Sequence, residues 1–299
     1  MRYEARAPLR IDFAGGWTDV PLYAEREGGA VLNAAITHYV RGYVSKPTAG
    51  GLLGHLRGER SYLSYGADLP AGAGLGVSAA ETVTWVTLVK TTVANDADRR
   101  EIAELACDIS RRMGILGGKQ DEYAAALGGI GYYTFGHSVG IERLDLGAAP
   151  TERFLDRLVL AHSGVKRVSS AIHETVWARY RAGDRDVAAA LSRLTTIAGE
   201  MRQALSAADL DSVAELMNEN WLNQVRLSPA VTSPDLDAFI GHGMRHGAIA
   251  AKVCGAGGGG CVLFMTRAGE TGRLRAALGR RVRVIDFSID TYGVYLNKD

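Results

Sequence analysis

Two patterns of hydrophobic and polar positions run along the chain. Residues 3–13 and 37–46 alternate with a period of two, which is typical of β-strands with one buried face. Residues 77–94 carry apolar side chains three to four positions apart, which predicts a helix. From residue 168 to residue 226 the pattern is almost entirely helical. The chain is therefore predicted to have an α+β fold.

Cap and turn residues place the remaining elements. A helix is expected from Asp98, as its N-cap, to Met113, and a shorter helix is expected within 117–129. Residues 129–147 predict a β-hairpin, and Pro234 marks the start of a later helix. Short strands are expected at 158–164, 248–254, 260–266, 282–289 and 292–297, with one helix at 270–279.

The change of pattern near Pro150 predicts a domain boundary. The chain has 299 residues, enough for one large domain or two ordinary ones. Strands and hairpins dominate before Pro150, and long helices follow soon after it. We therefore expect one domain over residues 1–150 and a second over residues 151–299.

Composition and charge exclude several classes of protein. Lys and Arg number 34 and Asp and Glu 33, a net charge of +1, which offers no basic surface for nucleic acid or an anionic membrane. The N-terminal residues contain no apolar signal-peptide core, and the longest apolar runs fall short of ~18–20 residues. Three cysteines without a CxxC spacing favour neither disulfides nor structural zinc. We expect a cytoplasmic protein, a monomer or a homodimer, with a small-molecule partner.

Glycine gathers in short stretches that carry the candidate chemistry. The chain has 37 glycines, about 12% of its residues against a usual value of roughly 7%. The stretch PAGAGLGVSAAETV (70–83) places glycine at positions 72, 74 and 76, directly before a predicted helix. Free amides at a helix N-terminus bind anions. A Walker A loop is excluded, because no lysine follows these glycines.

A dinucleotide-binding turn is the main competing interpretation of this stretch. Residues 74–79 fit G-x-G-x-x-A, and Asp96 follows about 20 residues later. However, the motif requires a buried apolar strand before the glycines, and SYLSYGADLPA (61–71) is a poor one. Asp96 also follows a long helix rather than a second strand. The stretch therefore favours a triphosphate-binding loop, with Ser78 on the phosphates or on Mg²⁺. A tight turn that caps a helix is the structural alternative.

Two further stretches contain glycine beside polar residues. APLRIDFAGGWTDVP (7–21) leads from a strand into a turn, with Arg10 a candidate for phosphate charge and Asp19 for sugar or alcohol hydroxyls. A solvated turn fits this stretch equally well. KVCGAGGGGCVLF (252–264) places glycines between two predicted strands, which suits close approach to a ligand or to another loop. A flexible hairpin tip is the alternative.

In this order and spacing, the three stretches resemble the GHMP small-molecule kinases, a family that includes galactokinase, homoserine kinase and mevalonate kinase. The resemblance covers the whole chain. RAPLRIDFAGGWTDVP, GGKQDEYAAALGG and KVCGAGGGGCVLF are most similar to bacterial D-glycero-D-manno-heptose 7-phosphate kinases and to the kinase half of fucokinases. The resemblance implies a two-domain GHMP kinase fold, with a ribosomal-S5-like N-terminal domain, a ferredoxin-like C-terminal domain and an active site between them.

The resemblance also implies a role for each candidate residue. Asp121 would be the catalytic carboxylate that orients or deprotonates the sugar hydroxyl, and Arg10 would stabilise charge beside it. Ser78 would contact Mg²⁺, so ATP and Mg²⁺ are the expected cofactors. The ATP-binding residues would be Pro70, Gly72, Ala73, Gly74, Leu75, Gly76, Val77, Ser78 and Ala79. The sugar or sugar-phosphate substrate would contact Gly16, Trp17, Thr18, Asp19, Gly255, Gly257 and Gly258.

Two positions depart from the family pattern. Val77 stands where a serine is usual, which removes one side-chain donor to phosphate. Ser110 stands where a metal-binding glutamate is usual, and Asp108 lies about 200° away around the helix. Glu81, one turn after Ser78, is a candidate to approach the metal. The alternative is that Glu81 only complements the helix dipole.

The expected function is that of an ATP- and Mg²⁺-dependent sugar kinase acting on a heptose 7-phosphate or related sugar, at its anomeric hydroxyl. A kinase for another monosaccharide or small alcohol stays open. A catalytically weakened relative that binds sugar and nucleotide also stays open, because of Val77 and Ser110. His162, Lys166 and Arg167 follow a predicted strand and are candidates to hold an anionic group of the substrate.

Overall fold

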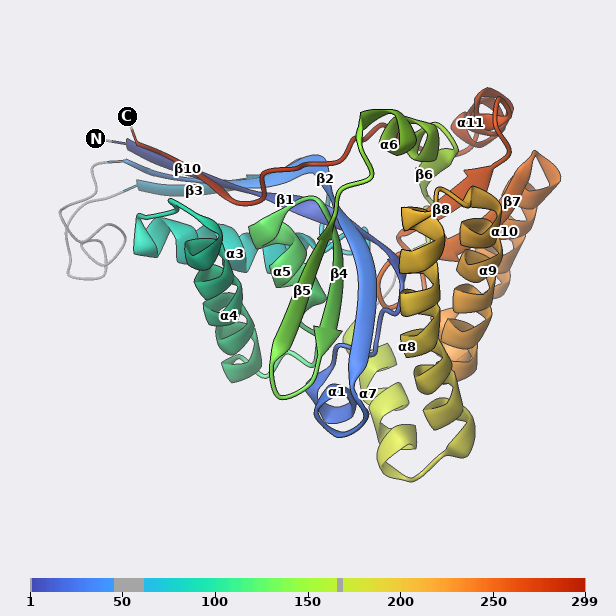
Figure 1. Cartoon of the computed structure of the whole chain (residues 1–299), viewed down its shortest axis with the longest axis horizontal. Coiled ribbons are helices and arrows are strands. Elements are labelled where there is room, and N and C mark those ends of the chain that lie inside the picture. The colour runs from blue at the N-terminus through green and yellow to red at the C-terminus, as the bar shows by residue number, and fades with distance from the viewer. Residues whose placement is uncertain (1, 46–61, 166–168, 299) are drawn as a thin grey trace.

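The first half of the chain folds around a six-stranded antiparallel sheet (Figure 1). The computed structural model describes residues 2–45, 62–165 and 169–298. In the first sheet the strand order is β10-β1-β2-β4-β5, and β3 also pairs with β2. Because the last strand pairs with the first, both chain ends lie at the same edge of the molecule. The strands are β1 (Arg2–Ala14), β2 (Gly29–Ser45), β3 (Tyr62–Ala67), β4 (Ile130–Phe135), β5 (Val139–Leu144) and β10 (Tyr295–Lys298).

A four-stranded sheet forms the opposite end of the molecule (Figure 1). Its order is β7-β8-β6-β9, and all strand pairs in the described residues of both sheets are antiparallel. This pairing rules out a dinucleotide-binding fold, which is built on parallel strands. The strands are β6 (Leu158–His162), β7 (Ala248–Val253), β8 (Cys261–Thr266) and β9 (Val284–Ile285).

Helices cover the first sheet and connect it to the second. Helices α3 and α5 pack on β1 and β2, and α4 packs outside them. Helix α8 contacts β2, while α9 contacts both α8 and β7, so this antiparallel pair lies between the two sheets (Figure 1). The helices are α1 (Pro21–Glu27), α3 (Val77–Lys90), α4 (Asp96–Arg112), α5 (Gln120–Leu127), α6 (Ala148–Leu155), α7 (Ser169–Arg181), α8 (Arg185–Ser206), α9 (Leu210–Leu227), α10 (Pro234–Arg245) and α11 (Thr271–Gly279), with a 3₁₀ turn at Pro229–Val231.

The predicted α+β class is confirmed, but several element boundaries were wrong. Strand β2 begins at Gly29 rather than residue 37, because its first eight residues are all buried and lack the alternation of a half-exposed strand. Helix α3 ends at Lys90 rather than 94, since Thr91 adopts a left-handed conformation with φ 56°. The N-cap of α4 is Asn95, whose side chain accepts the Asp98 amide; Asp98 is therefore not the cap.

Two short helices and one strand were missed, besides the 3₁₀ turn at Pro229–Val231. Helix α1 has seven residues, fewer than a periodicity window needs. Residues 63–67 of strand β3 are all exposed, so the strand lacks the alternation of buried and exposed positions that marks a half-buried strand. Helix α6 contains Pro150, which we took to close the first domain; proline is tolerated there because it lies in the first turn, where no intrahelical amide is required. Of residues 282–289, only Val284–Ile285 form a strand.

The hydrophobic core is shared by residues before and after position 150. One cluster contains Phe13 and Leu32 of the first sheet together with Phe154, Leu160 and Leu263 from beyond that point. The rings of Phe13 and Phe154 meet edge to face, with centroids 5.3 Å apart. The two halves are therefore closely packed on each other, and the division at residue 150 stays a prediction.

A fully buried ion pair also joins the two halves. The Lys252 side chain, on β7, and the Asp12 side chain, on β1, are both 0% exposed. Lys252 Nζ donates to Asp12 Oδ2 and to the Asp12 carbonyl, each at 2.6 Å. Asp12 Oδ1 accepts the amide of Gly255 at 2.9 Å. Both charges are compensated by these contacts, so the cost of removing them from water is offset only while the pair is intact.

Replacing one partner of this pair is predicted to be strongly destabilising. Lys252→Met leaves Asp12 as an uncompensated buried charge, and we expect the free energy of unfolding to fall by about 3–5 kcal/mol. Urea denaturation followed by circular dichroism measures this change. Adding Asp12→Leu to Lys252→Met removes the stranded charge and is expected to recover part of the loss.

Arg111→Ala provides the matched control. Arg111 pairs with Asp108 on the surface, where the two side chains are 65% and 51% exposed, so its loss is expected to cost less than about 1 kcal/mol. A Lys252→Met variant no less stable than this control would contradict the assignment of the buried pair as a tertiary clamp.

Candidate active site

A cleft of about 460 Å³ opens where the glycine-rich stretches meet. Its lining residues fall within 10–20, 71–79, 110–122, 173–174 and 255–256, so it draws on both halves of the chain. We refer to this space as the cleft. Its lining is polar as well as apolar, and it contains the N-terminus of α3 and the first turn of α5.

The loop before α3 requires its alternate glycines. Gly72, Gly74 and Gly76 have φ values of 85°, 83° and 75°, a region that side chains other than glycine's rarely adopt. Gly76 is the N-cap residue of α3, so the first amides of that helix face the cleft without a side-chain cap. This arrangement is suited to an anion.

The predicted ATP-binding residues divide between the surface of this loop and its underside. Gly72, Gly74, Gly76, Val77, Ser78 and Ala79 line the cleft. Ala73 and Leu75 are fully buried beneath it, and Pro70 is exposed outside it. The Leu75 carbonyl accepts the Arg10 amide at 3.0 Å, which fixes the loop to β1. The buried pair thus supports the loop rather than facing a ligand.

Arg10 and Asp121 form a bidentate ion pair beside the loop. Arg10 Nε donates to Asp121 Oδ1 and Nη2 donates to Oδ2, both at 2.6 Å, while Nη1 donates to the Gly74 carbonyl at 2.5 Å. The Asp121 side chain is 26% exposed and the Arg10 side chain 6%, so the carboxylate faces the cleft in front of the guanidinium. Burial acts to lower the pKa of Arg10, but Asp121 and Asp12 together raise it above its ordinary value.

Asp19 supports the helix that carries Asp121. Its Oδ2 accepts the Gln120 amide at 2.9 Å, at the N-terminus of α5, and Oδ1 accepts Gln120 Nε2 at 3.3 Å. A Cβ at Gly118 would lie 1.7 Å from the carboxylate, so only glycine fits there. Burial raises the pKa of Asp19 to about 6 despite the hydrogen bond from Gln120.

The other predicted substrate residues of this turn differ in placement. Gly16 and Trp17 line the cleft. Thr18 does not, because its hydroxyl is buried and bonds to Gly15 and Ala30 within the protein. Trp17 has φ 84°, an unusual conformation for a bulky residue, and its ring stacks on His173 with centroids 4.3 Å apart.

Two buried polar atoms on this wall of the cleft lack hydrogen-bond partners. Trp17 Nε1 is a donor without an acceptor, and Gln120 Oε1 is an acceptor without a donor. Both side chains line the cleft. Buried polar groups are normally paired, so these two atoms are suited to the hydroxyl groups of a ligand. Gln120 was missed from sequence, since nothing in its local pattern distinguishes it from an ordinary helix-start residue.

The third glycine stretch mainly packs against other loops. Gly255 lines the cleft. Gly257 and Gly258 instead pack on Val231, whose carbonyl accepts the Gly258 amide at 2.6 Å. At Gly260, a Cβ would lie 2.7 Å from the Ala73 carbonyl, so the stretch also presses on the underside of the 72–76 loop. Most of this stretch therefore approaches other loops rather than the cleft.

Of the residues that the sequence suggested for a metal ion, only some line the cleft. Ser78 is exposed and lines the cleft. Glu81 is not among the lining residues and lies near Tyr65, whose pKa is raised by burial and by the Glu81 charge. Ser110 does line the cleft, and its hydroxyl donates to Glu122 Oε1 at 3.2 Å.

Glu122 is a second residue that the sequence prediction missed. It follows the predicted Asp121 directly, lines the cleft, and is only 5% exposed. Burial, and then the charge of Asp121, raise its pKa to about 8. Its Oε2 atom has no hydrogen-bond partner. In the described part of the chain, no group of three or more His, Cys, Asp or Glu side chains could by itself hold a metal ion.

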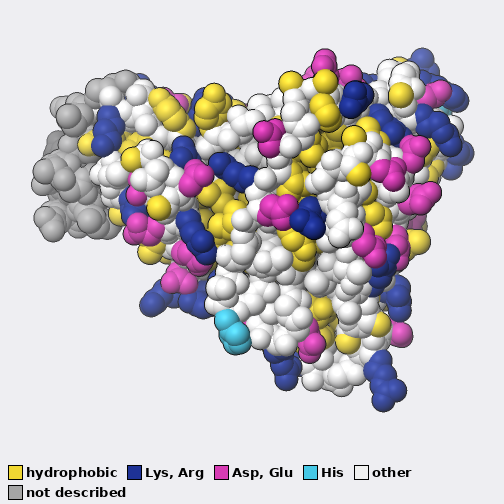
Figure 2. All heavy atoms as spheres, viewed as in Figure 1, with side chains coloured by type: hydrophobic (Ala, Val, Ile, Leu, Met, Phe, Trp, Pro, Cys, Tyr) yellow, Lys and Arg dark blue, Asp and Glu magenta, His cyan; other side chains and the backbone are white. Residues whose placement is uncertain are grey.

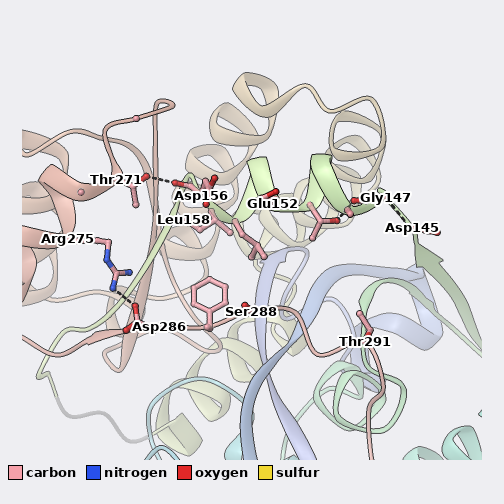
Figure 3. A pocket seen from close by; sticks show the side chains of 16 residues that line it. Asp145, Gly147, Glu152, Asp156, Leu158, Thr271, Arg275, Asp286, Ser288 and Thr291 are labelled. Atoms are coloured by element: carbon pink, nitrogen blue, oxygen red, sulfur yellow. Dashed lines mark hydrogen bonds and ion pairs between the residues drawn. The ribbon is translucent and has the colours of Figure 1, made fainter.

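A second hollow, of about 910 Å³, lies between α6, α11 and residues 286–291 (Figure 3). Asp145, Glu152, Asp156 and Asp286 line it together with Arg275, which pairs with Asp286. Unlike the cleft, this hollow contains none of the alternate glycines before α3 and, among the described residues, none of the buried polar atoms without hydrogen-bond partners. The cleft is therefore the better candidate site.

The surface shows charges of both signs interspersed over most of the face in Figure 2. Across the described residues, no helix combines the length and apolar character needed to span a bilayer. His162 lies outside the cleft lining and accepts the Gly164 amide at Nδ1. Lys166 and Arg167 lie outside the described residues.

Comparisons with known proteins agree with this geometry. Residues 45–129 match the model of the GHMP kinases N terminal domain, and residues 201–283 match the GHMP kinases C terminal model. The chain is 27% identical to the D-glycero-alpha-D-manno-heptose 7-phosphate kinase of Campylobacter jejuni, over 97% of each chain. It is 25% identical to the bifunctional fucokinase/GDP-fucose pyrophosphorylase of Arabidopsis thaliana, over 96% of this chain but only 32% of that protein.

A solved structure shows the same fold over the whole chain. The D-glycero-D-manno-heptose 1-phosphate kinase of Bacteroides thetaiotaomicron superposes with a TM-score of 0.77 at 22% identity, covering 99% of both chains. The two matched family models together span more than half of the 299 residues, and the first of them contains α3 and α5, which line the cleft. This chain therefore belongs to the GHMP kinase family of ATP-dependent phosphotransferases and has the two-domain fold of that family.

Proposed function

We propose that this protein is a sugar kinase that transfers the γ-phosphoryl group of ATP to the anomeric hydroxyl of a heptose 7-phosphate or a related sugar. The observation that carries the proposal is the bidentate Arg10–Asp121 pair, which lies between an anion-binding glycine loop and a polar pocket. Similarity to the Campylobacter jejuni heptose 7-phosphate kinase supports this choice of substrate.

The glycine loop and α3 would hold the triphosphate. Phosphoryl transfer depends mainly on positioning and on neutralisation of charge. The uncapped amides at the start of α3 and the helix dipole provide both for phosphate oxygens. Val77 contributes no hydroxyl, so the backbone and Ser78 would make the polar contacts at this point.

Asp121 would receive the sugar hydroxyl. Its carboxylate faces the cleft, and both of its oxygens accept hydrogen bonds from Arg10, which holds it in one orientation. From there it can orient the attacking hydroxyl or accept its proton. The Arg10 guanidinium, bound at the same time to the Gly74 carbonyl, links this carboxylate to the phosphate loop.

The substrate pocket fits a compound rich in hydroxyl groups. Trp17 Nε1 and Gln120 Oε1 offer one unpaired donor and one unpaired acceptor. Satisfying these atoms removes the cost of burying them, which favours a polyol over an apolar alcohol.

The cleft residues fit a divalent cation bound with the nucleotide. The orphaned Glu122 oxygen and the Ser78 hydroxyl are oxygen donors of the kind Mg²⁺ prefers, and a few protein ligands suffice when phosphates and water complete the shell. Bound there, Mg²⁺ would neutralise phosphate charge. We also propose that the protein lies in the cytoplasm, because its three cysteines are buried and a reducing compartment keeps such thiols reduced.

The substrate prediction is tested by measuring ADP release. Purified protein with ATP and Mg²⁺ is offered D-glycero-D-manno-heptose 7-phosphate, fucose, galactose and mevalonate in parallel. We expect the heptose phosphate to give the highest kcat/KM, with the product phosphorylated at the anomeric position as judged by ³¹P NMR. A higher kcat/KM with another sugar would correct the substrate, and no turnover with any of them would favour a binding protein.

Asp121→Asn is predicted to abolish most of the turnover. The amide keeps the shape of the side chain but cannot accept a proton, so kcat is expected to fall by at least ~10²-fold. Binding of an ATP analogue, measured by calorimetry, should change little. Glu101→Gln, at an exposed surface pair with Lys90, is the control and should retain full activity. Equal activity of the Asp121→Asn variant and wild type would contradict the catalytic assignment.

Gly76→Ala is predicted to weaken ATP binding. A Cβ at this position would lie 3.3 Å from the Arg10 side chain and 3.4 Å from that of Asp121. Because φ is also 75°, we expect the substitution to strain the loop by about 1–3 kcal/mol. We expect the Kd for ATP to rise by roughly tenfold, which corresponds to about 1.4 kcal/mol. Gly269→Ala has a similar φ of 78° but open space around it and lies beside the other hollow, so it serves as the control.

A further inference from the structure

We propose that Glu122, the residue after the candidate catalytic aspartate, supplies the protein carboxylate that binds the divalent cation of the nucleotide complex. This inference rests on the proposed ATP-dependent function. It names a ligand on α5, where the sequence pattern suggested a residue on α4 or Glu81 on α3.

The geometry of Glu122 points to a missing partner. The residue is 5% exposed and lines the cleft, so its carboxylate is largely withdrawn from bulk water. One oxygen accepts the Ser110 hydroxyl at 3.2 Å, and the other has no hydrogen-bond partner. A buried carboxylate oxygen left unpaired is costly, and a bound cation would satisfy it.

The charge balance of the cleft points the same way. In the described residues that line it, Asp19, Asp121, Glu122 and Glu174 are acidic and Arg10 is the only Lys or Arg. Arg10 is already engaged by Asp121. A nucleotide triphosphate adds further negative charge at the start of α3. A divalent cation between the phosphates and Glu122 would offset this repulsion.

Ser110 and Glu122 face each other across the packed helices α4 and α5. The small side chain at position 110 leaves room for the longer one at 122 and orients it with a hydrogen bond. A carboxylate on either helix could therefore reach the same part of the cleft. The acidic ligand is then retained, but it lies on α5 instead of α4, which accounts for the serine at position 110.

Cation binding can be measured without turnover by electron paramagnetic resonance of Mn²⁺ in the presence of a non-hydrolysable ATP analogue. For Glu122→Gln we expect the Kd of Mn²⁺ in this complex to rise at least tenfold. Affinity for the analogue without metal should stay within about twofold of wild type. Asp108→Asn, an exposed acid on α4, is the control and should bind Mn²⁺ like wild type.

A compensating variant separates a metal ligand from a structural acid. In Ser110→Glu combined with Glu122→Gln, the carboxylate returns to α4, and Mn²⁺ affinity is expected to recover to within about threefold of wild type. Unchanged Mn²⁺ affinity in Glu122→Gln, with the thermal transition intact, would overturn the inference but leave the kinase proposal standing. If the wild-type protein bound neither the analogue nor its Mn²⁺ complex, the proposed function itself would fail.

Discussion

The buried contact between Lys252 and Asp12 is the constraint on which the geometry of the cleft depends. It joins β7 to β1 where neither side chain can reach water, and it leaves one Asp12 oxygen to accept the Gly255 amide. Asp12 lies two residues after Arg10, and a Cβ at Gly16 would lie 3.0 Å from its carboxylate. One pair of charges thus fixes the third glycine stretch relative to the strand that carries Arg10.

Close packing of backbone against backbone extends this constraint to the loop of residues 72–76. The amide of Cys261 donates to the Ala73 carbonyl at 2.8 Å, and Gly260 has no room for a side chain beside the same loop. Arg10, on β1, also donates to the Gly74 carbonyl. The loop is therefore held from both halves of the chain, so its amides are oriented before a nucleotide binds, and less ordering entropy is lost on binding.

The electrostatics of the cleft follow from the same compactness. Asp19, Asp121 and Glu122 lie close enough to influence one another, and burial raises the pKa values of Asp19 and Glu122. Each acid has a different neighbour: Asp19 has the start of α5, Asp121 has Arg10, and Glu122 has a serine and one free oxygen. Three similar side chains therefore have three different surroundings: Asp19 supports a helix, while the proposed roles of Asp121 and Glu122 are contact with the substrate and binding of a cation.

The sequence by itself determined the α+β class and the family, because these depend on local periodicity and on motifs in a fixed order. It also singled out the glycine loop, Arg10 and Asp121 as candidates, through the glycine spacing and the family resemblance. Only the tertiary structure decided the neighbours. Asp19 accepts the amide of Gln120, 101 residues further along the chain, and the Thr18 hydroxyl is buried in its own turn. Gly257 and Gly258 pack against Val231, and Ser110 donates to Glu122. The physical reason is that hydrogen bonds and ion pairs between distant residues leave no periodic trace along the chain, so a buried carboxylate reveals its role only when its partners, or their absence, can be seen.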